Sequence, residues 1–156
     1  MRFRSLSAVL CSALVLAACN GSDSTAPAVD ITTVNFASNL GITLSQMNKN
    51  ADGLYLQDAP AGTGATAVKG NQVTVNYTGY YTNGTQFDTS IGKSPLVLPL
   101  GQGQVIAGFD EGITGMKVGG TRKLVIPPAL GYGATAHGSV PANSILVFTV
   151  QLIPTP

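Results

Sequence analysis

The sequence predicts an α+β domain in which an antiparallel β-sheet wraps around one short α-helix. The 156 residues include 19 glycines, and short apolar runs separated by turn residues make up most of the chain. Both features are typical of a turn-rich β domain. Only one stretch has the apolar spacing of a helix. A chain of this length is sufficient for one domain with its own hydrophobic core.

Short strands and turns account for most of the chain from residue 52 onward. Val73, Val75 and Tyr77 alternate with polar residues, which predicts a half-buried strand. Asn83-Gly84 then supplies the positive φ angles of a tight hairpin turn. The predicted strands cover residues 54–56, 72–77, 85–87, 96–98, 121–126 and 145–152.

Residues 105–116 predict the helix. Their apolar side chains recur at spacings of three, four and three, which places them on one helix face. These side chains are Ile106, Phe109, Ile113 and Met116. The segment also contains three glycines, so it needs packing on the sheet to be stable. The adjacent acids Asp110-Glu111 do not face each other on a helix, and we predict that they lie on a solvated edge.

The N-terminus predicts export. Arg2 and Arg4 precede an apolar stretch over residues 6–18, which is too short to span a bilayer and is typical of a secretory signal. It ends in Leu16-Ala17-Ala18-Cys19, which resembles the lipobox of bacterial lipoproteins and implies a lipidated Cys19. The alternative is an ordinary cleavage site beside an incidental cysteine. Acyl chains contribute roughly 0.8 kcal/mol per buried CH₂, so several on one cysteine would hold a domain at a membrane.

The chain is predicted to have four parts. Residues 1–18 form a lipoprotein signal peptide, 19–30 the lipidated cysteine and a flexible tether, 31–51 an N-terminal extension, and 52–156 the folded domain. The apolar residues of the extension fit neither the helix nor the strand period. We expect an exported, membrane-anchored lipoprotein of the bacterial cell envelope. Asn20 after the cysteine favours the outer membrane, facing the periplasm.

Composition excludes several functions. Without Arg2 and Arg4, six basic residues face seven acidic ones, for a net charge of about −1. The chain has no basic run, which argues against a nucleic-acid partner. Its two cysteines lie in the first 19 residues and its single histidine is His137, so we predict no disulfide, no metal site and no cofactor. The sequence around His137 also has no nucleophile-elbow pattern for a Ser-His-Asp triad.

The aromatic residues suggest an apolar pocket. Phe87 and Asp88 follow the hairpin turn, and a ring beside a carboxylate is either ordinary packing with a turn cap or the wall of a pocket with one polar anchor. Each candidate by itself is more typical of a core position. The pocket candidates are Tyr77, Phe87, Ile106, Phe109, Tyr132 and Phe148.

Residues 53–153 resemble the FKBP-type peptidyl-prolyl cis-trans isomerases. The resemblance covers the whole predicted domain and depends on a series of motifs in one order. They are Val75-Asn76-Tyr77-Thr78-Gly79, Asn83-Gly84, Phe87-Asp88-Thr89-Ser90, Pro99-Leu100-Gly101, Val105-Ile106-Ala107-Gly108-Phe109-Asp110-Glu111-Gly112, Met116-Lys117-Val118-Gly119, Ile126-Pro127-Pro128, Leu130-Gly131-Tyr132-Gly133-Ala134 and Leu146-Val147-Phe148.

The resemblance implies a role for individual residues. The Tyr132 hydroxyl and the Ile106 backbone N–H would bind substrate carbonyls, and Phe109 would form the floor under the proline ring, where many relatives carry tryptophan. The catalytic residues implied are Asp88, Tyr132, Ile106 and Phe87. The substrate-binding residues implied are Tyr77, Phe87, Val105, Ile106, Phe109, Tyr132 and Phe148, together with His137 and Val140 on an overhanging loop.

Three departures from the family pattern affect the expected ligands. Leu96 stands where many relatives have an aromatic residue, the 89–95 loop lacks an arginine to pair Asp88, and Ser139 replaces an apolar residue. The resemblance implies proline-containing polypeptide clients and a macrolide ligand of the tacrolimus class. The departures bear on macrolide affinity and substrate preference more than on activity.

Together these features predict a membrane-tethered prolyl isomerase that assists the folding of exported proteins. One alternative is a binding module or chaperone that holds proline-containing segments without catalysis. Another is a structural surface lipoprotein with a degenerate pocket. Some relatives dimerise through a long N-terminal helical region, but only about twenty residues are available here, so we predict a monomer.

Overall fold

The structure is a computed structural model that describes residues 29–155. The predictions for the signal peptide, for lipidation of Cys19 and for most of the tether lie outside the described residues.

Seven strands form one antiparallel sheet, which confirms the predicted fold class. They are β1 (Asn48–Lys49), β2 (Tyr55–Asp58), β3 (Gln72–Tyr81), β4 (Gln86–Thr89), β5 (Leu96–Pro99), β6 (Thr121–Ile126) and β7 (Leu146–Ile153). The hydrogen-bonded order is β1-β2-β6-β7-β3-β4, and β5 also pairs with β3. Strands β4 and β5 pair with different ends of β3, so they follow each other along the edge of β3 that does not pair with β7.

Strand β3 is longer than predicted. The alternation of apolar and polar residues predicts a strand to Tyr77, but β3 pairs with β7 as far as Tyr81↔Leu146. The added residues include two consecutive tyrosines on opposite faces: Tyr81 packs with the main core and Tyr80 with a second cluster. Because both positions are aromatic, the period-two pattern is hidden in the sequence.

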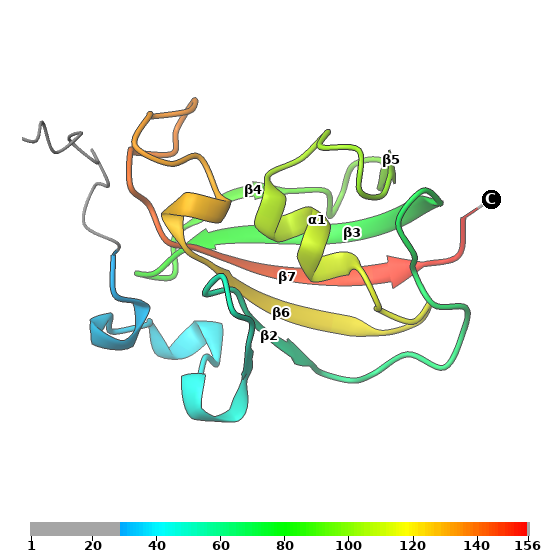
Figure 1. The fold of residues 1–156 in the computed structure, drawn as a ribbon, viewed down its shortest axis with the longest axis horizontal. Coiled ribbons are helices and arrows are strands. Elements are labelled where there is room, and N and C mark those ends of the chain that lie inside the picture. The colour runs from blue at the N-terminus through cyan, green and yellow to red at the C-terminus, as the bar shows by residue number, and fades with distance from the viewer. Residues whose placement is uncertain (1–28, 156) are drawn as a thin grey trace, which may run out of the picture.

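The helix α1 (Ala107–Ile113) lies across one face of the sheet (Figure 1). It is shorter than the predicted 105–116 because the residues on either side, Ile106 and Thr114, have non-helical ψ angles of 144° and 130°. Two of its glycines lie so close to β6 that an added Cβ would be 2.5 Å from side-chain atoms of Ile126 and Leu124. This close packing on the sheet stabilises a sequence that is a poor helix former.

The prediction of a solvated edge at Asp110-Glu111 is wrong. Asp110 is buried, and its Oδ1 accepts a hydrogen bond of 2.7 Å from the backbone N–H of Gly101. The Glu111 carboxylate is partly buried and accepts from the side chain of Asn50. Adjacent residues on a helix point in different directions, and here each direction leads to a separate polar contact.

The N-terminal extension covers the face of the sheet opposite α1. It forms three short 3₁₀ turns, η1 (Ile31–Thr33), η2 (Ser38–Leu40) and η3 (Leu44–Gln46), which explains why its apolar residues follow neither regular period. Its apolar side chains pack with the sheet residues Tyr55, Tyr80, Val125 and Val147 and with Ile145, just before β7. The Lys123 ammonium also donates a 2.8 Å hydrogen bond to the Leu40 carbonyl. The extension is thus a structural part of the domain.

Arg122 ties the end of α1 to the sheet. The side chain is buried, and its Nη1 donates to the carbonyls of Gly112 and Thr114 at 2.9 and 3.2 Å. Its other nitrogens bind both carboxylate oxygens of Asp58 at 2.6 and 3.0 Å. The arginine therefore satisfies carbonyls at the helix C-terminus that have no partner within the helix.

Candidate active site

A cavity of about 380 Å³ opens between β3, β4, the start of α1 and the segment that joins β6 to β7. It brings together residues that are far apart in the sequence, including nearly all of the predicted site. The lining residues are Tyr77, Phe87, Asp88, Leu96, Gln104, Val105, Ile106, Phe109, Tyr132, His137 and Phe148.

Aromatic rings form the floor and one wall of this cavity. The Phe109 ring meets Tyr77 and Phe148 edge to face, with centroids 5.7 and 5.2 Å apart. Phe87 meets Phe148 in the same way at 5.6 Å. Edge-to-face packing is a favourable arrangement for such rings, so the apolar wall is fixed by contacts among its own members.

The rings pack closely because strand β3 carries a glycine beneath them. A Cβ at Gly79 would lie 2.6 Å from Phe87 and 2.8 Å from Phe148, so any side chain here would force the rings to shift. The β3–β4 register also shifts at this point, between Gly79 and Tyr80. We did not predict this role for Gly79, although a glycine inside a strand is a sequence signal for close approach.

Asp88 and Tyr77 form the polar pair of the cavity. The Tyr77 hydroxyl donates a 2.6 Å hydrogen bond to Asp88 Oδ2. Burial, together with the hydrogen bond and the negative charge of Asp88, raises the pKa of Tyr77 to about 12. Lys93 lies 3.9 Å from Asp88 Oδ1, but both side chains are well exposed, so the arginine missing from the loop is replaced by a weak surface pair.

Tyr132 and His137 form the opposite rim. Their rings stack with centroids 4.5 Å apart and planes 6° from parallel. Burial raises the pKa of Tyr132, and the charge of Asp88 contributes to the rise. The Tyr132 hydroxyl is therefore protonated at neutral pH and available as a hydrogen-bond donor.

The backbone N–H of Ile106 is a second donor at the cavity. Ile106 is the residue before α1, and its carbonyl already accepts from the N–H groups of Phe109 and Asp110 at 3.0 and 3.1 Å. Among residues 29–155, no group accepts a hydrogen bond from the Ile106 N–H. This free donor at the start of a helix is available to a ligand carbonyl.

The overhanging loop is held in place from below. The Tyr81 hydroxyl donates a 2.5 Å hydrogen bond to the Ser139 carbonyl, and His137 and Val140 pair through their backbones. Val140 was predicted to line the cavity but does not. Its side chain is 4% exposed and belongs to the main core. Gln104 lines the cavity and was not predicted, since a lone glutamine in a loop carries no pattern.

Two kinds of feature are absent from the described part of the chain. No group of three or more His, Cys, Asp or Glu side chains within residues 29–155 is arranged to hold a metal ion. None of the helices in the same range is long and apolar enough to cross a membrane.

Comparison with known proteins assigns the family. Residues 64–153 match the FKBP-type peptidyl-prolyl cis-trans isomerase family. The chain is 52% identical over 103 residues to an FK506-binding protein of Neisseria meningitidis serogroup B, a match that covers 65% of this chain and 94% of the relative. This chain belongs to the FKBP-type peptidyl-prolyl cis-trans isomerase family.

Other relatives of this isomerase agree with the assignment. It is 44% identical over 115 residues to the peptidyl-prolyl cis-trans isomerase FKBP15-3 of Arabidopsis thaliana, over 72% of this chain and 80% of that one. The crystal structure of AtFKBP13 superposes with a TM-score of 0.66 and 35% identity, over 70% of this chain and 98% of that one. The crystal structure of FkpA from Escherichia coli gives a TM-score of 0.65 and 40% identity, over 70% of this chain and 51% of that one.

Proposed function

We propose that this isomerase rotates Xaa-Pro bonds of exported polypeptides at the bacterial cell envelope, held there by lipid on Cys19. One observation carries the catalytic part: a single cavity of about 380 Å³ combines packed aromatic rings with a tyrosine hydroxyl and a free backbone N–H. The lipobox-like Leu16-Ala17-Ala18-Cys19 supports the location.

The proposed mechanism needs no nucleophile. Rotation about a peptide bond has a barrier of about 18–20 kcal/mol because resonance gives the C–N bond partial double-bond character. Resonance and much of the amide dipole are lost in the twisted transition state. An apolar cavity therefore destabilises this state less than the planar amide. The enzyme accelerates rotation because it binds the twisted form more tightly than the planar form.

We assign each side chain a part in this binding. Phe109 forms the floor under the proline ring, and Phe87 and Phe148 form the apolar wall. The Tyr132 hydroxyl and the Ile106 N–H donate to the carbonyls that flank the proline and fix the substrate while the bond rotates. Asp88 holds the Tyr77 ring in place through their 2.6 Å hydrogen bond.

We also propose a macrolide of the tacrolimus class as a competing ligand. Relatives named FK506-binding proteins support this ligand. Phe109 keeps an apolar floor without the indole N–H that tryptophan would offer, and Leu96 offers a smaller apolar surface than an aromatic residue. We expect binding with a lower affinity than a cavity carrying both aromatic residues would show.

We propose that the protein acts as a monomer. The apolar side chains of the N-terminal extension already pack against the sheet of their own chain, so they are not available to a second copy. Sedimentation of the purified full chain should give the mass of one copy. A stable dimer at micromolar concentration would contradict this part of the proposal.

A binding module without catalysis is the second candidate, and two substitutions distinguish it from an isomerase. In Asp88→Ala and Tyr132→Phe, we expect kcat/KM for an Xaa-Pro tetrapeptide to fall more than the affinity for the same peptide. That result is expected if these groups stabilise the twisted transition state of the substrate more than the planar ground state. Equal losses of rate and affinity would favour the binding module.

The anchor is tested separately in bacterial cells that process lipoproteins. Metabolic labelling with an alkyne fatty acid should mark the wild-type protein, which should sediment with the outer membrane. Cys19→Ser should remove both the label and the sedimentation, while Cys11→Ser should change neither. A wild-type chain that carries no lipid and is recovered in the periplasmic fraction would contradict the anchor.

A further inference from the structure

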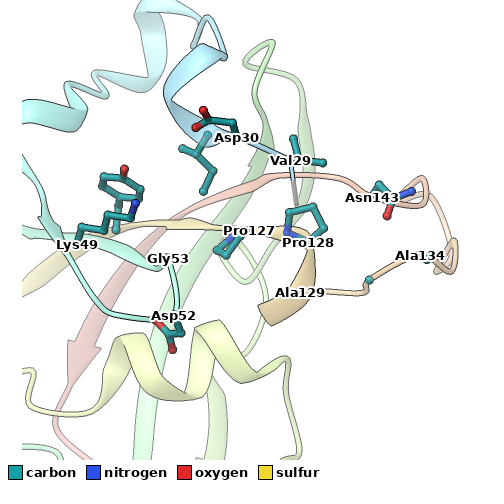
Figure 2. A pocket seen from close by; sticks show the side chains of 13 residues that line it. Val29, Asp30, Lys49, Asp52, Gly53, Pro127, Pro128, Ala129, Ala134 and Asn143 are labelled. Atoms are coloured by element: carbon teal, nitrogen blue, oxygen red, sulfur yellow. The ribbon is translucent and has the colours of Figure 1, made fainter. Parts of the chain in front are cut away.

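A second cavity, of about 530 Å³, lies where the N-terminal extension meets the end of the sheet. We call it the groove. Figure 2 shows Asp30 and Asp52 on opposite sides of it, with Pro127 and Pro128 between them. The groove shares no lining residue with the cavity described above. It is lined by Val29, Asp30, Ile31, Lys49, Asp52, Gly53, Tyr55, Pro127, Pro128, Ala129, Gly133, Ala134 and Asn143.

The groove has an apolar base. Ile31 comes from the extension, Tyr55 from β2, and Pro127 and Pro128 from the turn that follows β6. Ile31, Tyr55 and Pro128 are buried, so the apolar surface that is open to the groove comes mainly from Val29, Pro127 and Ala129. Apolar surface beside a few polar groups is the usual composition of a binding site.

The charges of the groove are unbalanced. Its lining contains the carboxylates of Asp30 and Asp52 and one ammonium, that of Lys49. The Lys49 nitrogen lies 5.5 Å from the centre of the Tyr55 ring. Hydrogen bonds from Thr32 hold the pKa of Asp30 below its ordinary value, so its carboxylate is charged at neutral pH. A ligand that carries a positive charge complements this arrangement.

We propose that the groove binds an extended polypeptide segment in which an apolar side chain neighbours a lysine or arginine. The apolar side chain would lie on Pro127 and Ala129, and the cation would lie between Asp30 and Asp52. This binding is separate from the isomerisation reaction. Only the identification of the segment with a client of the isomerase rests on the proposed function.

The position of the groove favours a client polypeptide as its occupant. The segment between β6 and β7 presents Tyr132 and His137 to the isomerase cavity and Gly133 and Ala134 to the groove. Gly133 is held by a 2.9 Å hydrogen bond to the Pro128 carbonyl and accepts one of 2.7 Å from the Asn143 N–H. The two cavities thus lie on either side of one anchored segment, within reach of one extended chain.

Binding is measured by fluorescence anisotropy with the full chain and a labelled, proline-free hexapeptide of alternating leucine and lysine. Asp30→Asn removes the charge while its amide oxygen can still accept from Thr32. Ala134→Arg fills the groove and adds a positive charge. Ala136→Arg places the same side chain on the same segment, outside both cavities, and is the matched control. A hexapeptide with glutamate for lysine tests the charge preference.

We expect saturable binding of the leucine-lysine peptide and weaker binding of the glutamate peptide. Asp30→Asn should weaken binding about two- to fivefold, the effect of one exposed ion pair. Ala134→Arg should weaken it at least about tenfold, since it blocks the apolar base and repels the cation. Ala136→Arg and Asp88→Ala, which alters only the isomerase cavity, should change it less than about twofold.

Three results would overturn the proposal. The first is no saturable binding by a chain that is folded by circular dichroism. The second is equal binding to the wild-type, Asp30→Asn and Ala134→Arg proteins. The third is self-association of the chain that Ala134→Arg abolishes, since a second copy would then be the occupant. None of these depends on isomerase activity, so they are distinguishable from a failure of the proposed function.

Discussion

The two faces of the β-sheet carry similar apolar side chains but are completed differently. On one face, the 3₁₀ turns of the extension bring Ile31 and Leu40 onto Val125 and Val147, and the cluster is closed by the chain itself. On the other face, α1 covers the middle of the sheet, but its first turn leaves a cavity lined by Phe109 and other rings. Apolar packing alone therefore does not distinguish a core from a site.

Polar groups make the difference between the faces. At the cavity, Asp88 and Tyr77 are hydrogen-bonded to each other, and the Ile106 N–H has no acceptor within residues 29–155. On the closed face, the polar group that reaches the extension, the Lys123 ammonium, is satisfied by two carbonyls. A free donor beside packed rings distinguishes the cavity from the closed face.

Truncation on the closed face should have the largest effect on stability. Leu40→Ala should lower the free energy of unfolding by about 2–5 kcal/mol, the usual cost of deleting a buried leucine side chain. The kcat/KM of the remaining folded protein should be unchanged, because Leu40 does not line the cavity. Urea unfolding and the isomerase assay measure the two quantities. Ser45→Ala, on the exposed part of the extension, is the control and should stay within about 0.5 kcal/mol. An unchanged stability in Leu40→Ala would show that the extension is not part of the core.

Substitution at the polar pair should have the opposite profile. Asp88→Asn should lower kcat/KM by about 10- to 100-fold, because a hydrogen bond to a charged group contributes about 1.5–3 kcal/mol. Tyr77→Phe should cause a similar loss, and the double variant should lose little more than either single variant. Additive losses would mean that the two side chains act independently of their hydrogen bond.

Adding one carbon under the rings tests how the cavity is shaped. Gly79→Ala should lower the free energy of unfolding by about 1–3 kcal/mol, the cost of overpacking, because the new Cβ displaces Phe87 and Phe148. Activity per folded molecule should fall as well, unlike in Leu40→Ala. If Gly79→Ala retained full activity, the position of the rings would not matter for catalysis.

Tyr77 should also make stability depend on alkaline pH. The pKa of Tyr77 is about 12 in the folded state and about 10 when exposed. Between these values the unfolded chain releases this proton and the folded chain keeps it, so the free energy of unfolding falls as pH rises from about 10 toward 12. Urea unfolding across this range should show a shallower fall in Tyr77→Phe. Identical slopes would contradict the raised pKa.

The smallest effect is expected at the rim of the cavity. Lys93→Ala removes a partner 3.9 Å from Asp88, but the side chains of Lys93 and Asp88 are 67% and 47% exposed. Such a pair contributes at most about 1 kcal/mol and is screened by salt. We expect kcat/KM to change by less than about twofold at physiological ionic strength. A tenfold loss would mean that Lys93 replaces the family arginine in full.

The difference between the faces also explains which parts were predictable from sequence. Within one element, side-chain period reports which residues share a face, so six of the seven strands and Phe109 and Ile113 of α1 were found. The two-residue strand β1 was missed. The motif resemblance then brought Tyr77, Phe87 and Tyr132 into one site. The cavity was therefore predictable from local sequence patterns together with the arrangement known for the family.

The features that were missed depend on contacts between remote elements. The extension follows no regular period because its short turns take their shape from the sheet beneath. Asp110 was predicted to be solvated because the helix pattern does not show that the loop at Gly101 folds over it. Val140 lies in the overhanging loop, but its side chain is buried in the core. The loop is held by a 2.5 Å hydrogen bond between Tyr81 and Ser139, a contact between remote elements that no local pattern shows.

The most direct test is the rate of cis-to-trans isomerisation of an Xaa-Pro tetrapeptide with the purified full chain, with and without tacrolimus. We expect the wild-type protein to accelerate the reaction and tacrolimus to suppress that acceleration. Asp88→Ala should strongly reduce it, and Leu40→Ala should retain it in full per folded molecule. A folded wild-type protein that gives no acceleration, or an Asp88→Ala variant as active as wild type, would contradict the assignment of catalysis to this cavity.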